Sequence, residues 1–326
     1  MSITIIKPGI LTTIQDGGRW GFQHLGINPG GAMDIRAMQI ANCLVLNNVH
    51  EASLEFYFPA PVIQFNQPAF IALSGADFGA SVNETAIPIN QPVYVPANAI
   101  LRFNAKKKGQ VGYLAVQTGF ALHDWLNSYS THLKVKAGGY EGRALMANDE
   151  LYINNNRHFS ESNQETTVLP WKADTESFYT SNPFHFIPGH EFDRLSEQAR
   201  RIFTTESFLI QPHSDRMGYH LKGPELSLYE QKAMISSAVT AGTIQLLPNG
   251  QCILLMADHQ TTGGYPNIGH VIGADLPGLA QKATGQALHF TPIDIVTAEN
   301  LWVMQEQHLQ QLMNACKLQL DAYHRH

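Results

Sequence analysis

The sequence predicts a mainly β protein with a few helices, on the basis of three observations. Short apolar runs recur along the chain and are separated by Gly, Pro, Asn and Asp. The 17 prolines lie mostly between these runs, which is typical of sandwiches and barrels and unlike a helical bundle. The length of 326 residues corresponds to about two domains at roughly 150 residues per domain.

Strands are expected where an apolar run is bounded by turn-forming residues. The predicted strands are Ser2–Ile6, Phe70–Leu73, Val93–Val95, Ile100–Phe103, Gly112–Val116, Leu151–Ile153, Phe184–Ile187 and Cys252–Met256.

Three segments are predicted to be helical. Asp34 is a good N-cap for a helix from Ile35 to about Val45. Apolar residues three or four positions apart predict two further helices, and each apolar stripe is expected to face the core. These stripes are Phe192, Leu195, Ala199, Ile202 and Phe203 in the first, and Leu309, Leu312, Met313 and Cys316 in the second.

The polar, interrupted segment His158–Thr180 is the best candidate for a domain linker. It divides the chain into an N-terminal domain, 1–175, and a C-terminal domain, 176–326. Strands exchanged between the two domains would shift this boundary.

Composition excludes several classes of function. The net charge of −6 argues against nucleic acid as a partner, because phosphate binding needs clustered Lys and Arg. No apolar run approaches the ~18 residues of a membrane span, and the N-terminus does not resemble a signal peptide. The three cysteines are far apart and form no metal or disulfide pattern. We therefore expect a cytoplasmic protein.

The charged fraction of the chain is 15%, against about 25% in typical domains, which suggests that part of its surface is buried against another chain.

The usual signatures of cofactor, metal and nucleophile are absent from the sequence. It contains no phosphate-binding P-loop, no dinucleotide fingerprint, no zinc-protease motif and no G-x-S-x-G elbow. We expect no intrinsic cofactor and no metal site, and a chain that supplies part of a shared site.

Four glycine-rich clusters suggest close backbone approach instead. In the first, residues 15–34, Arg19 can hold a carboxylate or phosphate, and Asp34 either caps the helix or acts chemically. The second, residues 138–143, reads as a tight turn with an exposed Glu141–Arg143 pair. In the third, Arg216 forms a structural ion pair with Asp215 or clamps an anion.

The fourth cluster is the densest and directly follows the apolar run at residues 252–257. A strand that ends in hydroxyls, an amide, a carboxylate and two glycines can form the rim of a binding site, although an ordinary hairpin connection explains the same pattern. The cluster comprises Asp258, His259, Gln260, Thr261, Thr262, Gly263, Gly264, Tyr265 and Pro266.

At these clusters the sequence resembles the family of bacterial 5-oxoprolinase C subunits, also described as KipA-like or biotin-dependent carboxyltransferase-like and formerly as allophanate hydrolase subunit 2. The segments that carry the resemblance are TTIQDGGRWGFQHLGINPGGAMD, KAGGYEGRAL, SDRMGYHLKGPEL and LPNGQCILLMADHQTTGGYPNIGHVIGADLPGLAQ. The family usually has Ser where this chain has Gly30, and the chain has no biotinylation-type Met-Lys-Met.

The resemblance implies two cyclophilin-like β-barrel domains. It implies one subunit, inactive alone, of an ATP-dependent hydrolase that opens 5-oxoproline to L-glutamate. Partners would be a KipI-like B subunit and a lactam-utilisation-type A subunit, with ATP and Mg²⁺ as co-reactants. Two alternatives are a regulatory protein that blocks a KipI-type kinase inhibitor, and a carboxyltransferase component that uses carboxybiotin.

Opening an activated lactam requires anion binders, oxyanion donors and a base. We assign Arg19 and Arg216 to anion binding, and Asp34 or Asp258 to acid–base catalysis or to contact with a metal ion. The loop that follows Asp258 would bind substrate and oxyanions, through Gln260, Thr261, Thr262, Gly263, Gly264 and Tyr265.

Overall fold

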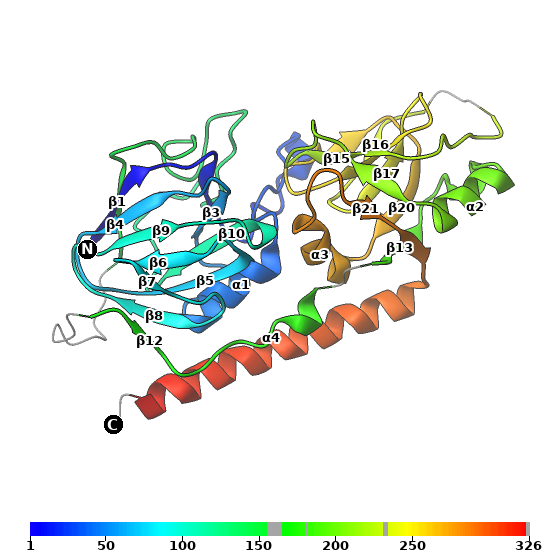
Figure 1. The fold of residues 1–326 in the computed structure, drawn as a ribbon. Helices are drawn as coiled ribbons and strands as arrows, with labels where there is room; N and C mark the ends of the chain where they lie inside the picture. Colours follow the sequence, from blue (N-terminus) through cyan, green and yellow to red (C-terminus); the bar gives the residue numbers. More distant parts are fainter. Residues whose placement is uncertain (155–164, 180–181, 231–233, 324–326) are drawn as a thin grey trace. The chain divides into compact units, whose positions relative to one another are not determined.

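The protein is described by a computed structural model that covers residues 1–154, 165–179, 182–230 and 234–323. Contacts divide the chain into two units (Figure 1). Unit 1 contains 1–19, 34–176 and 306–326, and unit 2 contains 20–33 and 177–305. The predicted domains, 1–175 and 176–326, stay a prediction. Segment 20–33 groups with unit 2 and segment 306–326 with unit 1. The described residues of these two segments contain no strand, so the segments that cross the predicted boundary are not strands.

Unit 1 has two six-stranded sheets around one core. The first has the order β11-β1-β4-β9-β6-β7 and the second β12-β8-β5-β10-β3-β2. Alternate apolar residues of both sheets, such as Ile3, Ile63, Leu54 and Ile71, are fully buried in the shared core. The strands are β1 Ser2–Lys7, β2 Thr12–Gln15, β3 Ser53–Tyr57, β4 Val62–Phe65, β5 Ala69–Asp77, β6 Ala80–Val82, β7 Thr85–Ala86, β8 Pro92–Val95, β9 Ile100–Phe103, β10 Lys108–Val116, β11 Glu150–Tyr152 and β12 Thr167–Val168.

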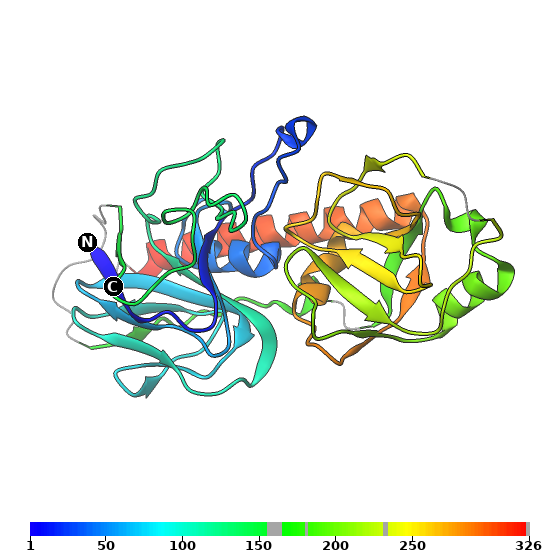
Figure 2. The ribbon, with the colours of Figure 1, turned by 90° about the horizontal axis from the view of Figure 1, so that it is seen from above.

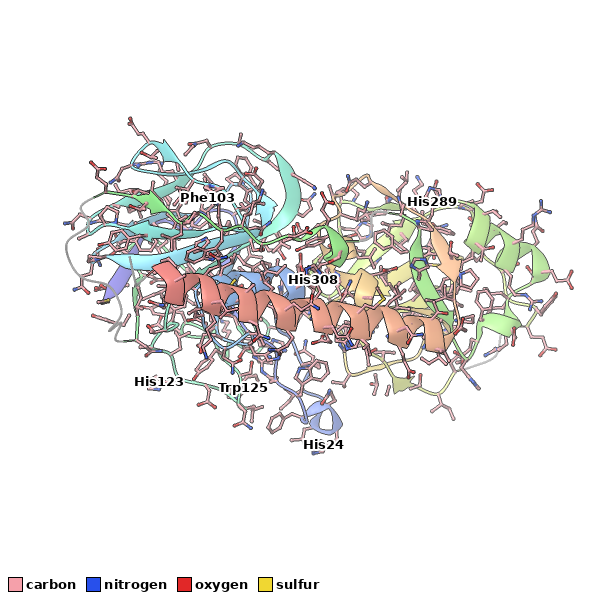
Figure 3. All side chains as sticks on the ribbon, turned by 90° about the horizontal axis from the view of Figure 1, so that it is seen from below. His24, Phe103, His123, Trp125, His289 and His308 are labelled. Carbon is pink, nitrogen blue, oxygen red and sulfur yellow. The ribbon has the colours of Figure 1, made fainter. Side chains whose placement is uncertain are left out.

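Unit 2 is built on an eight-stranded sheet with the order β21-β14-β15-β18-β17-β20-β13-β22. The edge strands β21 and β22 are separated in sequence by His289 alone, which Figure 3 labels. The two edges must therefore lie close together, and the sheet curls into a nearly closed barrel. The strands are β13 Phe184–Pro188, β14 Phe208–Ile210, β15 Gly218–Lys222, β17 Thr243–Leu246, β18 Cys252–Leu255, β20 Asn267–Val271, β21 Ala287–Leu288 and β22 Phe290–Pro292.

A separate two-stranded ribbon of β16 (Ser237–Ala238) and β19 (Thr262–Gly263) belongs to unit 2 but not to its barrel, and β17 and β18 lie between its two strands in the sequence. The barrel core is aromatic. The rings of Phe203 and Phe290 stack with centroids 5.1 Å apart, and Phe186 meets Phe203 edge-on at the same centroid distance.

Four α-helices are present in the described residues: α1 Ile35–Leu44, α2 Glu197–Thr205, α3 Leu276–Ala280 and α4 Ile295–Tyr323. The predicted first helix is confirmed, and Asp34 caps it by accepting a hydrogen bond from Ala37 N at 2.9 Å. Helix α1 lies against β5 and β10, as Figure 2 shows from above.

The second predicted helix is only partly correct. The segment from Phe192 to Phe203 is interrupted, because Leu195 is extended and buried, and the α-helix begins only after Ser196. The Ser196 hydroxyl accepts from Ala199 N at 3.1 Å, which is the geometry of an N-cap.

The third predicted helix is confirmed within the longer α4, where Leu309 and Cys316 are buried. In the part of the chain that the structure describes, we find no helix with the length and apolarity needed to span a membrane.

The predicted strands are all present, with bounds that differ by a few residues at most ends. The predicted linker His158–Thr180 lies partly outside the described residues. Its described part contributes β12, which pairs with β8 at Thr167 and Val168. The mainly β fold class is therefore confirmed.

Candidate functional site

Strand β18 of the barrel leads into the densest polar cluster. It ends at Leu255, and the chain turns at Ala257 and Asp258 before β19 pairs with β16. The register places Gly263 opposite Ser237, and Val239 N donates to Thr261 O at 3.1 Å. The alternative of an ordinary hairpin connection is wrong, because β18 pairs with β15 and β17, whereas β19 pairs with β16. The loop after β18 leaves Thr262, Gly264 and Tyr265 exposed.

A guanidinium–carboxylate pair lies at the start of this cluster. Arg216 Nε donates to Asp258 Oδ2 at 2.9 Å, and Nη2 donates to Asp258 Oδ1 at 3.1 Å. The two backbones are also joined, because Asp258 N donates to Arg216 O at 2.8 Å. The Arg216 side chain is 8% exposed and that of Asp258 24% exposed, so a buried cation holds a carboxylate that still reaches solvent.

Arg216 has a further partner in the segment 20–33. Its Nη2 donates to Gly31 O at 2.6 Å. Gly31 has a backbone φ of +95°, which favours glycine, so the second glycine of the PGGAMD string meets a conformational need. Of the two alternatives for Arg216, the ion pair with the adjacent Asp215 is wrong, because Arg216 pairs with Asp258. Asp215 Oδ1 accepts instead from the backbone N–H groups of Met217 and Gly218, which closes a turn.

Behind the β16–β19 ribbon lies a polar patch that sequence reasoning missed. Thr243 and Gln245 on β17 are 1% and 0% exposed. They alternate with Ile244, which lies with Phe186 on the core side, where side-chain atoms of both residues approach Gly269. Thr243 and Gln245 therefore point to the outer face of the barrel. The polar–apolar alternation of TIQL is the sequence signal that could have found them.

Two histidines complete this patch. His270 on β20 pairs with Thr243, and its Nδ1 lies 3.3 Å from Thr243 Oγ1. His259 is 3% exposed, with Nδ1 2.6 Å from Gln260 O. Burial lowers the pKa of both imidazoles, and the neighbouring His259 lowers the pKa of His270 further. Both rings are therefore neutral at pH 7. We call Thr243, Gln245, His259 and His270 the outer-face cluster.

The Gln245 carboxamide is the least satisfied group of this cluster. Its Nε2 donates to Tyr265 O at 3.4 Å, at the long limit of a hydrogen bond. Its Oε1 is buried and accepts no hydrogen bond from any described residue. Gly263 lies directly over the group, because a Cβ at that position would overlap Gln245 Nε2.

Arg19 belongs to unit 1 and is 1% exposed. Its Nη2 donates to Ser130 O, and its guanidinium carbon lies 4.7 Å from the centroid of the Trp125 ring, labelled in Figure 3. Gly138 permits this arrangement, since a Cβ there would overlap Ser130 O. The structure therefore explains Arg19 by contacts within its own unit, and its anion-binding role stays a prediction.

A carboxylate network holds the same loop. Asp16 Oδ1 accepts from Ser128 Oγ at 2.7 Å, from Ser130 Oγ at 2.5 Å and from Gly18 N at 2.8 Å, while Oδ2 accepts from Tyr129 N at 2.6 Å. We call these five residues the Asp16 network. The carboxylate is 5% exposed, and each of its oxygens has at least one donor.

Asp34 is also in unit 1 and is fully buried. It caps α1, and its backbone N donates to Tyr113 Oη at 2.8 Å. This matches the capping alternative, and its acid–base role stays a prediction. The predicted Glu141–Arg143 pair forms, with Arg143 Nη2 2.8 Å from Glu141 Oε2.

The predicted site residues thus divide between the units. Arg19 and Asp34 lie in unit 1, while Arg216 and the whole 258–265 loop lie in unit 2. Among the described residues, no three His, Cys, Asp or Glu side chains gather as a metal site would require.

These observations define a mainly β protein with a nearly closed barrel and a polar site on the outer face of that barrel. The model of the family "Carboxyltransferase domain, subdomain A and B" matches residues 25–292. The chain belongs to this family.

Two curated relatives are similar over almost their whole length. The C subunit of 5-oxoprolinase from Escherichia coli K12 is 36% identical over 313 residues, which are 95% of this chain and 97% of the relative. The protein of the same name from Haemophilus influenzae is 35% identical over 310 residues, with the same coverage of both chains. The crystal structure of Kluyveromyces lactis urea carboxylase matches with a TM-score of 0.87 at 25% identity. That match covers 95% of this chain but 29% of the carboxylase chain.

Proposed function

We propose that the chain is one subunit of an ATP-dependent 5-oxoprolinase, which opens 5-oxoproline to L-glutamate. The observation that supports this most strongly is the 36% identity to the C subunit of a 5-oxoprolinase over nearly the full length of both chains. The enzyme also contains a KipI-like B subunit and a lactam-utilisation-type A subunit, and it acts in the cytoplasm. The chain alone is inactive, and ATP and Mg²⁺ act in the assembled enzyme.

The chemistry of the lactam sets what the site must do. An amide carbon is a poor electrophile, and transfer of the ATP γ-phosphoryl group to the lactam oxygen activates it. Water then adds to that carbon, the ring C–N bond breaks to give the amine, and a second water releases phosphate. The protein has to position the ring, stabilise oxyanions and provide a base for water.

Asp258 is suited to the role of base. Arg216 fixes both of its oxygens, and the carboxylate retains lone pairs and access to solvent. Arg216 then acts as a positioning residue, since two of its nitrogens are engaged by Asp258 and Gly31. The Thr261 and Thr262 hydroxyls and the backbone at Gly263 and Gly264 supply oxyanion donors. Gln260 and Tyr265 contact the substrate.

The test is glutamate release from 5-oxoproline with ATP and Mg²⁺, measured for the chain alone, with the B partner, and with both partners. Activity only in the full mixture is expected. Alanine at Asp258 should then lower kcat/KM by about tenfold or more, because ~1.4 kcal/mol of barrier corresponds to tenfold. Asp193→Ala is the matched control, because Asp193 pairs with Arg200 in the same unit but its side chain is 93% exposed.

A second candidate is carboxyl transfer from carboxybiotin to a small amide. It is supported by the carboxyltransferase family model and by the fold similarity to a urea carboxylase. Activity with a carboxybiotin carrier, and none with ATP and 5-oxoproline, would favour it. A stable complex with the B partner and no turnover in any mixture would favour the regulatory alternative.

A further inference from the structure

The outer-face cluster contains an acceptor that the fold leaves unused. Gln245 is 0% exposed, and its Oε1 has no hydrogen-bond donor among the described residues. A buried carboxamide oxygen without a donor costs about 1–3 kcal/mol, so such a group usually has a reason.

The other end of the carboxamide is only loosely held. Gln245 Nε2 has two hydrogens, and its described bond to Tyr265 O is 3.4 Å long. One Nε2–H and the Oε1 lone pairs therefore form a donor–acceptor edge. A lactam presents the complementary edge, because its ring forces the amide to be cis and places N–H and C=O side by side. An open-chain product such as glutamate has no such edge.

We propose that the Gln245 carboxamide recognises the lactam edge of the substrate, accepting its ring N–H at Oε1 and donating Nε2–H to its carbonyl oxygen. This inference rests on the proposed function for the identity of the ligand. It makes Gln245 a specificity-determining residue, placed beneath the loop that already contains the other predicted contacts.

Access to Gln245 requires the β16–β19 ribbon to move. Gly263 lies over the carboxamide, and the ribbon is attached to the barrel face through Val239, which packs with Ile253 and Leu255. The exposed residues Ser237, Ala238 and Thr262 make up the rest of its paired strands, so little apolar surface holds it down.

The structure offers a matched control. Gln305 on α4 is 8% exposed, its Nε2 donates to Ala274 O at 3.0 Å, and its Oε1 also has no described donor. It differs from Gln245 in lying on a helix, outside the strands and loop of the site. Gln245→Met and Gln305→Met therefore remove the same groups at similar burial.

The experiment compares the affinity of the assembled enzyme for two ligands. One is 5-oxoproline, and the other is its lactone analogue, in which a ring oxygen replaces the N–H. We expect the wild type to prefer the lactam by roughly tenfold or more, since a site built to hydrogen-bond an N–H rejects the analogue without it. Gln245→Met should lose this preference to within about twofold, and Gln305→Met should keep it. Gln245→Glu, which keeps an acceptor, should restore part of it.

Three outcomes overturn the inference. Equal lactam preference in Gln245→Met and the wild type, with glutamate release intact, refutes it and leaves the proposed function standing. Equal binding of lactam and lactone by the wild type refutes it without any variant, so a misfolded variant does not remove the test. Absence of both 5-oxoproline binding and turnover refutes the proposed function, and the assignment of a lactam to Gln245 with it.

Discussion

The Asp16 network in unit 1 and the outer-face cluster in unit 2 are both buried polar groups, yet they differ in how fully they are satisfied. Asp16 accepts four hydrogen bonds from one loop and its own turn. Gln245 makes one long bond and has an oxygen without a described donor. A closed network stabilises a loop, whereas an open one has capacity left for a ligand. The comparison shows that burial alone does not make a polar group a binding group, and that the acceptor of the outer-face cluster still has this capacity.

The largest expected effect is at the closed network. Asp16→Asn places an NH₂ group against the donors at Tyr129 N or Ser128 and Ser130, so one contact becomes donor to donor. We expect a loss of roughly 3 kcal/mol in the free energy of unfolding, because hydrogen bonds to a charged buried acceptor are involved. Urea denaturation measures it. Glu141→Gln, at a side chain 65% exposed, is the control and should change stability by less than about 0.5 kcal/mol. Similar small losses in both variants would mean that the Asp16 network does not stabilise the loop.

The next effect concerns the β16–β19 ribbon above Gln245. Gly263→Ala introduces a Cβ that overlaps Gln245 Nε2, whereas a Cβ at Gly264 lies 3.4 Å from Ser236 Oγ. We expect Gly263→Ala to lose about 1–3 kcal/mol of stability or to lower activity, since overpacking displaces the loop. Gly264→Ala should keep the stability of the wild type. Thermal unfolding of the two variants tests this, and an equal loss of stability at the two glycines would contradict the contact with Gln245.

The smallest effect is a pH dependence of the outer-face cluster. Burial lowers the pKa of His259 and His270 in the folded protein, so the unfolded chain binds protons first as the pH falls below about 6.5. The contribution of these neutral rings to the free energy of unfolding is therefore complete above that pH and is lost on acidification. The slope is at most ~1.4 kcal/mol per pH unit for each histidine.

Melting temperatures between pH 7.5 and 5.5 measure this dependence. His270→Gln should flatten the decline, while the exposed His24, labelled in Figure 3, should have no such influence when changed to Gln. If His270→Gln and His24→Gln give the same profile as the wild type, the outer-face histidines do not set the pH response.

The sequence by itself determined the mainly β class, most strand positions and the first helix, because alternation, turn residues and the Asp34 cap act over a few neighbouring positions. It also located the polar loop after β18 and its glycines. The sequence did not predict that the second helix is interrupted at Leu195, because the apolar stripe continues through that position. Ser196, which caps α2, was the local signal for the interruption.

Only the tertiary structure decided which charged and polar groups meet. Arg216 pairs with Asp258, 42 positions away, and not with the adjacent Asp215, because the antiparallel pairing of β15 with β18 brings the ends of those strands together. In a similar way, the antiparallel pairing of β17 with β20 places Gln245 and His270 on one outer face. Local alternation fixes which face of a strand is buried, but it does not say which strands become neighbours over long sequence separations, and that choice decides which side chains meet.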